Sequence, residues 1–169
     1  ISFPSASSLY EYNNQSLPYS SIPNAIFAFW DDLYQRSTGG VCIATTGSAP
    51  SREYVVEWND GHFCCSDVPT THLSFEVILS ETTNNIDVRY QRMEDTDGRA
   101  LGNSATIGIQ DDTTTRYDLV SFDRAGVVAS GSSIRWSPTV SGTRCDRGVY
   151  TRTFEGDCTP TVAASTDPF

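Results

Sequence analysis

The stretch that decides the fold is residues 72–91, HLSFEVILSETTNNIDVRYQ. Apolar and polar residues alternate along both of its halves, and the apolar positions are Leu73, Phe75, Val77, Leu79, Ile86, Val88 and Tyr90. A period of two places alternate side chains on one face of a strand. The polar segment between the halves contains Asn84 and Asn85, and either suits a left-handed turn position. The stretch therefore predicts a β-hairpin with one apolar face.

The same alternation recurs on both sides of this hairpin. In residues 52–58, Tyr54, Val56 and Trp58 share one face and Glu53 and Glu57 the other. Further short strands are predicted at 26–30, 41–46, 104–110, 116–122 and 132–136, separated by turn-rich spacers at 37–40, 47–50 and 111–115. Because no helical period is present, we expect an all-β, antiparallel, jelly-roll-like sandwich over residues 1–137, and an irregular tail over 138–169.

Composition narrows the class of protein. The chain has 169 residues, of which 38% are hydrophobic, enough for one folded domain. Its net charge of −10 argues against nucleic acid and anionic membranes as partners. No stretch approaches the roughly 20 apolar residues of a membrane span, and neither an initial Met nor a signal peptide is present. We therefore expect a processed extracellular chain without membrane insertion.

The five cysteines are Cys42, Cys64, Cys65, Cys145 and Cys158. They form no CxxC pairs, and two histidines are too few for a convincing zinc site, so disulfides are favoured. A Cys145–Cys158 bridge would staple the tail, and we expect Cys42 to pair with Cys64 or Cys65. One cysteine is then left free or pairs outside the chain. A bridge between the neighbours Cys64 and Cys65 is the less favoured alternative.

Several segments together resemble the nidogen-like class of extracellular β domains. They are IFAFWDDL at 26–33, TGSAPSREYVVEW at 46–58, FEVILSE at 75–81 with Asn85-Ile86, and ATIGIQ at 105–110. The resemblance covers roughly residues 1–136. In bacteria, domains of this class occur in large secreted or surface-attached proteins. The resemblance implies an extracellular or cell-surface location and a β-sandwich.

The resemblance also bears on the start of the sequence. In that class a Phe-rich strand and an Asn-Gly turn precede the segment that Ile1-Ser2-Phe3 resembles, and here they are absent. The front part could be lost by proteolysis, omitted from the sequence, or supplied by a neighbouring subunit. Since an open sheet edge is an aggregation hazard unless a strand covers it, we expect a structural or adhesion module. Its expected partner is another copy or a separate N-terminal fragment, in a surface assembly or filament.

Acidic loops are candidate calcium sites. Asp95 and Asp97 alternate before Gly98, and Asp111 could join them from a neighbouring loop. The favoured alternative is an ordinary turn that uses Asp and Gly for their backbone preferences. Asp31 and Asp32 could also ligate a cation, but we expect them to accept backbone N–H bonds and fix a turn.

Aromatic residues in polar segments could bind a glycan, because a planar ring stacks on a sugar face. The candidates are Tyr10, Tyr12, Tyr19 and Tyr34, whereas Trp30, Trp58 and Trp136 lie on strands and are expected in the core. A carbohydrate- or calcium-dependent binding module of a larger secreted protein is therefore the alternative function.

Enzymatic interpretations are less favoured. Glu57 and Glu76 could flank a glycosidic bond, but both occupy ordinary outward positions of alternating strands. A Ser-His-Asp triad built on His62 or His72 has no supporting nucleophile motif.

Overall fold

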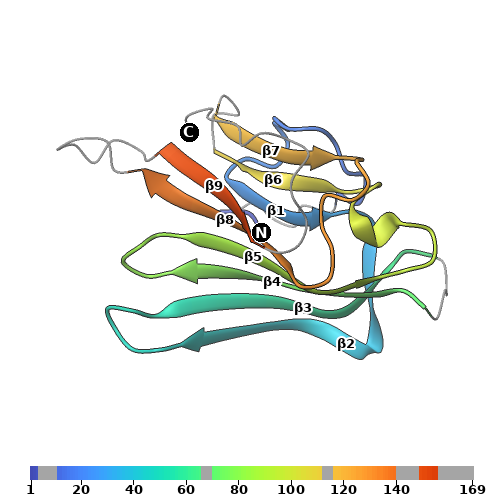
Figure 1. The fold of residues 1–169 in the computed structure, drawn as a ribbon, viewed down its shortest axis with the longest axis horizontal. Helices are drawn as coiled ribbons and strands as arrows, with labels where there is room; N and C mark the ends of the chain where they lie inside the picture. Colours follow the sequence, from blue (N-terminus) through green and yellow to red (C-terminus); the bar gives the residue numbers. More distant parts are fainter. Residues whose placement is uncertain (4–10, 66–69, 112–115, 140–148, 156–169) are drawn as a thin grey trace.

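The computed structural model describes residues 1–3, 11–65, 70–111, 116–139 and 149–155, the last segment and Thr139 by their backbone only. Two antiparallel sheets pack face to face (Figure 1), which confirms the predicted all-β sandwich. The small sheet has the order β1-β6-β7 and the large sheet β2-β3-β4-β5-β8-β9. The strands are β1 (Ala25–Trp30), β2 (Leu33–Thr46), β3 (Glu53–Phe63), β4 (His72–Ser80), β5 (Ile86–Glu94), β6 (Thr106–Gln110), β7 (Tyr117–Phe122), β8 (Ser132–Thr139) and β9 (Val149–Glu155).

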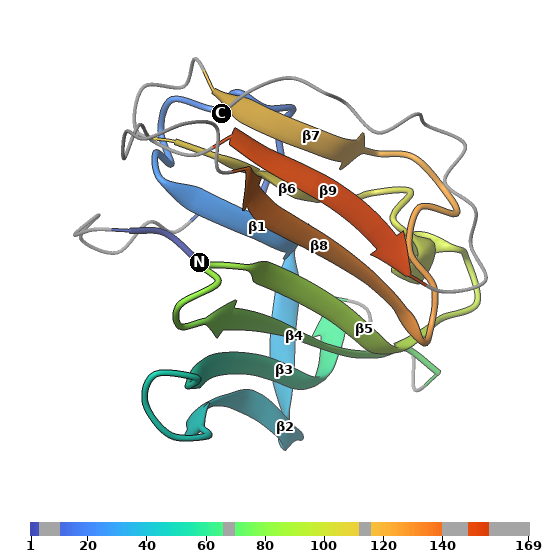
Figure 2. The ribbon, with the colours of Figure 1, turned by 60° about the vertical axis from the view of Figure 1, so that its left-hand side comes forward.

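The chain passes from one sheet to the other between β1 and β2. Only Asp31 and Asp32 separate the two strands, and Figure 2 shows the chain turning there from the small sheet to the far edge of the large one. The helical turn η1 (Arg99–Leu101) lies between β5 and β6, where the chain returns to the small sheet. After these two crossings β1 is the end strand of the small sheet, and only one of its two edges pairs with another strand of that sheet.

The small sheet covers only part of the large one. One row of paired side chains crosses the inner face of the large sheet through Ile43, Val56, Val77, Val88 and Ile134. Along this row the exposed fraction falls from 68% to 9%, 0%, 0% and 1%. The core therefore lies over β4, β5 and β8, and residues 41–46 of β2 are uncovered.

Two buried hydrogen bonds join the sheets inside the core. The Tyr90 hydroxyl on β5 donates to the carbonyl oxygen of Ala28 on β1 at 2.7 Å. The Trp136 indole N–H on β8 donates to Asp118 Oδ2 on β7 at 2.8 Å. Burial raises the pKa of Tyr90, so its phenol stays protonated and able to donate. Each bond satisfies a polar atom that would otherwise be buried without a partner.

The predicted hairpin at 72–91 is present as β4 and β5, and Asn84 has the expected left-handed φ of 53°. The predicted turn at 37–40 is wrong, because these residues continue β2 through a β-bulge between Gln35 and Gly40. Gly39 allows this path, since a Cβ there would lie 2.5 Å from the Asn59 carbonyl oxygen.

The expectation of an irregular tail from residue 138 needs correction. β8 runs on to Thr139, and β9 pairs with it from Ser133↔Glu155 to Thr139↔Val149. The unpaired edge of β8 offered main-chain hydrogen bonds that the sequence pattern did not reveal. Residues 140–148 and 156–169, which include Cys145 and Cys158, lie outside the described residues.

We expect Tyr90→Phe to lower the free energy of unfolding by about 1–3 kcal/mol, because the Ala28 carbonyl would stay buried without its donor. Tyr117→Phe is the matched control, since Tyr117 is 36% exposed on β7. Urea unfolding of both variants measures the difference. Equal midpoints for the two variants would show that the Tyr90 hydroxyl does not join the sheets.

Candidate functional site

A groove runs along the open edge of β1. Its volume is about 330 Å³, and its apolar lining comes from both sheets: Ile26, Phe29, Trp30, Leu33, Trp58 and Phe75. The Trp58 ring stacks on Phe75 with 5.1 Å between ring centroids, which makes a flat aromatic floor. The groove is therefore a cleft between the edge of one sheet and the inner face of the other.

The first residues of the chain show how this edge accepts an extended backbone. Ser2 forms an antiparallel bridge with Ala25. The Ile26 N–H donates to the Ile1 carbonyl at 2.8 Å, and the Ile1 amino group donates to the Ile26 carbonyl at 2.9 Å. Beyond Ile26, no strand of the described chain pairs with this edge of β1. A segment in line with Ile1 would therefore lie in the groove.

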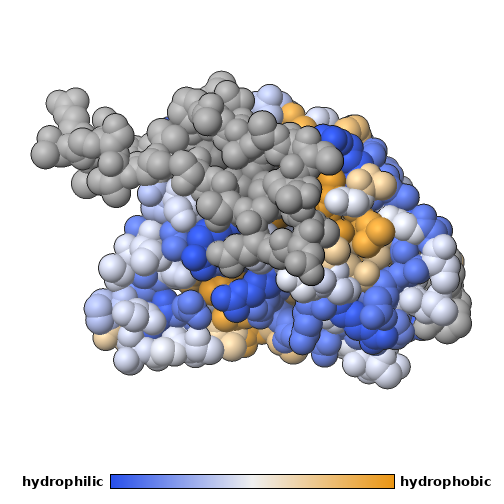
Figure 3. Space-filling model, viewed as in Figure 1, coloured by the Kyte–Doolittle hydropathy of each residue, from blue (hydrophilic) through white to orange (hydrophobic). Residues whose placement is uncertain are grey.

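The groove continues onto the uncovered inner face of β2 and β3. Val41, Ile43 and Tyr54 are 52%, 68% and 42% exposed there, and Val41 is paired directly with Trp58 in the groove. We call these three residues and Trp58 the open face. Figure 3 shows apolar surface at the lower centre of the molecule, with hydrophilic side chains around it. The four residues of the open face are uncharged, whereas Glu11 and Asp31 line the adjoining groove and Arg52 and Glu81 lie beside Tyr54.

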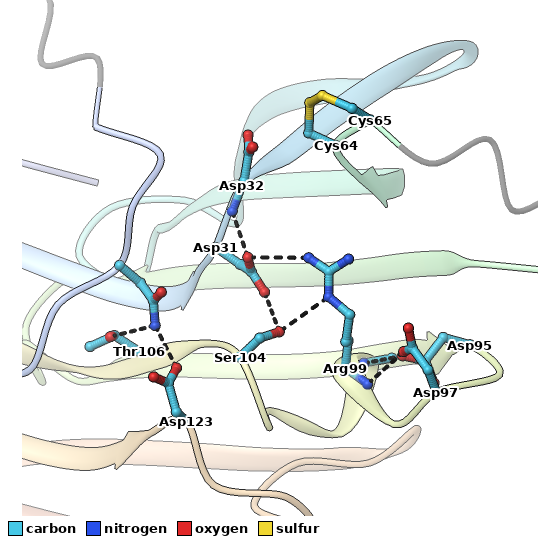
Figure 4. Close-up of polar contacts among 12 residues, drawn as sticks. Asp31, Asp32, Cys64, Cys65, Asp95, Asp97, Arg99, Ser104, Thr106 and Asp123 are labelled. Carbon is cyan, nitrogen blue, oxygen red and sulfur yellow. Dashed lines mark hydrogen bonds and ion pairs between the residues drawn. A yellow bond between two sulfur atoms is a disulfide. The ribbon is translucent and has the colours of Figure 1, made fainter.

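A polar network fixes the end of β1 beside the groove (Figure 4). Asp31 Oδ1 accepts the Asp32 N–H at 2.7 Å, and Asp31 Oδ2 accepts the Ser104 hydroxyl at 2.6 Å. Arg99 lies 3.6 Å from Asp31 Oδ1 and stacks over the Phe63 ring at 3.9 Å. Burial raises the pKa of Asp31, and the bond from Ser104 opposes that rise. Asp31 therefore fixes the turn between β1 and β2, as predicted.

The acidic loop after β5 uses its carboxylates on its own backbone. The two oxygens of Asp95 accept the N–H groups of Gly98 and Ala100, and Asp97 Oδ1 accepts that of Arg99 at 3.1 Å. Asp111 follows β6 and accepts from Arg116 Nε at 2.8 Å. The loop lies before β6 and Asp111 after it, so a strand about 17 Å long separates them. The structure does not bring the three together, and calcium binding stays a prediction.

The cysteines differ from the expected pairing. Cys64 and Cys65 form a disulfide with each other, and Cys42 is free and exposed. The register between β2 and β3 explains why, because Cys42 is paired with Glu57 whereas the Cys64 N–H donates to the Asp32 carbonyl at 2.7 Å. Glu57 of β3 is seven residues from Cys64, about 23 Å along an extended strand, so Cys42 lies far beyond disulfide reach of Cys64. The predicted bridge from Cys42 to Cys64 or Cys65 is therefore wrong.

The candidate sugar-stacking tyrosines are dispersed. Tyr10 lies outside the described residues, Tyr12 is 52% exposed, and Tyr34 is half-buried with its ring 5.9 Å from that of His62. Tyr19 is half-buried against Trp30, at 5.3 Å between ring centroids. Glycan binding stays a prediction.

Of the tryptophans, only Trp136 lies fully in the core, whereas Trp30 and Trp58 are half-buried and line the groove. Trp30 and Trp58 therefore pack against the core, as expected, but each keeps part of its side chain exposed. The small sheet ends at β1, so no strand covers their outer sides.

The two glutamates considered for glycoside cleavage are direct partners across β3 and β4. Glu76 also lies 3.4 Å from Arg89 Nη1 on β5, so two carboxylates and one guanidinium lie side by side on the outer face of the large sheet. Both line a shallow groove of about 370 Å³. This arrangement matches the outward positions expected from their strand pattern.

The histidines lie together on the large sheet with Asp60, a residue outside the sites predicted from the sequence. His72 Nδ1 is 2.5 Å from Asp60 Oδ1. The spacing of Asp60 and His62, two residues apart at the end of an alternating strand, is a weak signal that could have drawn attention to Asp60.

Comparison with known proteins gives a match to a family model. The model of a family described as NIDO related matches residues 1–148. No curated protein and no solved structure matches the chain. Within the described residues, no helix has the length and apolar character to cross a membrane.

We expect Asp95→Asn to lower the free energy of unfolding by about 1–2 kcal/mol, because an amide has one acceptor oxygen and cannot satisfy both N–H groups. Asp97→Asn is the matched control, since it keeps an acceptor for its single N–H, and we expect a change within about 0.5 kcal/mol. Urea unfolding measures both. A calcium-dependent rise in the midpoint that both substitutions abolish would instead support a cation site.

Proposed function

Because the chain belongs to the NIDO-related family, we propose that it is an extracellular structural and adhesion module that assembles with other copies of itself by strand addition. The observation that carries this proposal is the open face beside the unpaired edge of β1. A row of apolar side chains that is buried at one end and 68% exposed at the other supports a neighbour at the exposed end.

The proposed occupant is an extended segment of a second copy, lying along β1 and over the open face. The pairing of Ile1 with Ile26 supports this mode, because it is antiparallel β-pairing on the same edge. Fully burying a side chain such as Ile43 contributes about 1.5–3 kcal/mol, so covering Val41, Ile43 and Tyr54 together would support a specific interface.

Electrostatics support the open face as the place of contact. Two copies with a net charge of −10 each repel one another at long range, so contact is least costly where the surface is apolar and uncharged. Salt screens the repulsion between charges that are farther apart than the Debye length, which is about 8 Å at physiological ionic strength. Assembly through the open face should therefore strengthen as salt is added.

An extracellular location is part of the proposal. The Cys64–Cys65 disulfide supports an oxidising compartment, since disulfides persist there and are rare in reducing ones. Cys42 is exposed, so the tests below use the Cys42→Ser background to exclude artificial disulfide-linked dimers.

We expect Ile43→Glu to abolish concentration-dependent association and leave the melting temperature nearly unchanged, because Ile43 is 68% exposed within one copy. Ala44→Glu is the matched control, since Ala44 is also exposed but lies on the opposite face of β2. Light scattering after size-exclusion chromatography, at two salt concentrations, measures the mass of each variant. The control and the parent should associate alike, and more strongly at high salt.

Two outcomes would overturn the proposal. A parent chain that stays monomeric at all concentrations but binds specific sugars on a glycan array, with or without a chelator, would support the carbohydrate- or calcium-dependent module instead. Equal association of Ile43→Glu and Ala44→Glu would show that the contact between copies does not lie on the open face.

A further inference from the structure

The only two histidines of the chain converge on one carboxylate. His62 near the end of β3, His72 at the start of β4 and Asp60 offer ligand atoms that all lie within 4.8 Å of one another. His72 Nδ1 is 2.5 Å from Asp60 Oδ1, and His62 Nε2 is 3.7 Å from Asp60 Oδ2. The rings of the two histidines meet edge-on, 5.7 Å apart between centroids.

The surroundings of His62 are unusual for a structural histidine. Its side chain is 1% exposed, and neither ring nitrogen has a hydrogen-bond partner among the described residues. A buried imidazole normally satisfies at least one nitrogen, because an unpaired buried polar group is costly. Gln35 Oε1 is buried and unpaired as well, on β2 at the position paired with Gly61. The two ring nitrogens of His62 and Gln35 Oε1 are therefore free to act as ligand atoms inside the sheet.

Solvent reaches two of the three side chains of the cluster. The Asp60 and His72 side chains are each 25% exposed, so an ion can reach the cluster from solvent.

The backbone of β3 holds Asp60 in place. The pairing of β3 with β4 changes register between Trp58 and Gly61, and Asp60 has a left-handed φ of 53° within that irregularity. Its N–H donates to Ser74 Oγ at 3.1 Å, and Thr38 Oγ1 donates to Asp60 Oδ2 at 3.2 Å. β-Bulges commonly re-aim a side chain next to a functional site. Here the irregularity sets the carboxylate between both histidines.

We propose that Asp60, His62 and His72 form a binding site for a divalent transition-metal ion, with zinc as the matching ion. Two imidazoles and one carboxylate are a ligand set that zinc accepts at distances of about 2.0–2.2 Å, which spaces neighbouring ligand atoms by roughly 3.4 Å. The separation of 3.7 Å between His62 and Asp60 is close to that spacing. The bond between His72 and Asp60 opens on binding, as both side chains reach solvent. Three ligands leave a fourth position for water or for a group from another molecule.

The test titrates zinc chloride into the chelator-treated full chain and follows the heat of binding. We expect one ion per chain, and a loss of affinity of at least about 100-fold in both Asp60→Asn and His72→Gln, since changes outside the ligand shell alone cost 10–100-fold. Glu53→Gln is the matched control, because it also removes one carboxylate from β3 but far from the cluster. Far-UV circular dichroism checks that each variant folds.

A second measurement uses the unaltered chain. Since it has only two histidines, long-range 1H–15N spectra contain two imidazole systems, and zinc should shift one nitrogen in each. No binding at millimolar zinc, binding that both variants retain, or a shift in neither or only one imidazole would overturn the site. None of these readouts depends on self-association, so either the metal site or the proposed assembly can be overturned without the other.

Discussion

The rest of the structure depends on the unequal width of the two packed sheets. A sheet with one apolar face must cover that face, and here three strands cover part of six. The buried hydrogen bonds of Tyr90 and Trp136 fix where the small sheet lies, because each links an inner-face side chain of the large sheet to a strand opposite. Cover is therefore nearly complete over β5 and β8 and absent over residues 41–46 of β2. The groove at β1 and the open face are two consequences of this one placement.

The second constraint is the irregular pairing of β3 with both of its neighbours. Its register shifts against β2 between Gln35 and Gly40, and against β4 between Trp58 and Gly61. A strand that kept strict alternation would not need the left-handed Asp60, nor a Gly39 packed against the Asn59 carbonyl. The same irregularity thus bends the long hairpin and gathers Asp60 with the two histidines. Local chain geometry, rather than sequence proximity alone, makes this cluster.

The sequence predicted those features that depend on short-range pattern. The strands at 72–80 and 86–94 could be anticipated because period-two alternation reports directly on one buried face. The cysteine pairing could not, because it depends on which residue of β2 lies opposite Glu57. β9 was missed because an edge strand paired on one side needs little apolar alternation. The histidine cluster was missed because its members converge only through the register of two strands and a bulge. Asp31 was anticipated as a turn residue because its role is local.

The two proposals meet in the least covered part of the fold. The hairpin of β2 and β3 carries the open face, and Tyr34 of β2 is paired with His62 of the histidine cluster. The inner faces of β4, β5 and β8 pack against the small sheet, but Val41, Ile43 and Tyr54 of this hairpin are exposed. A ligand that binds only the folded state stabilises it by RT ln(1 + [L]/Kd). An ion held by Asp60, His62 and His72 would join β3 to β4 without any apolar burial, and would so stabilise the hairpin while leaving its face free for a neighbour. Metal binding and strand addition would then stabilise the hairpin in two different ways, because the ion links β3 to β4 and the added strand covers the open face.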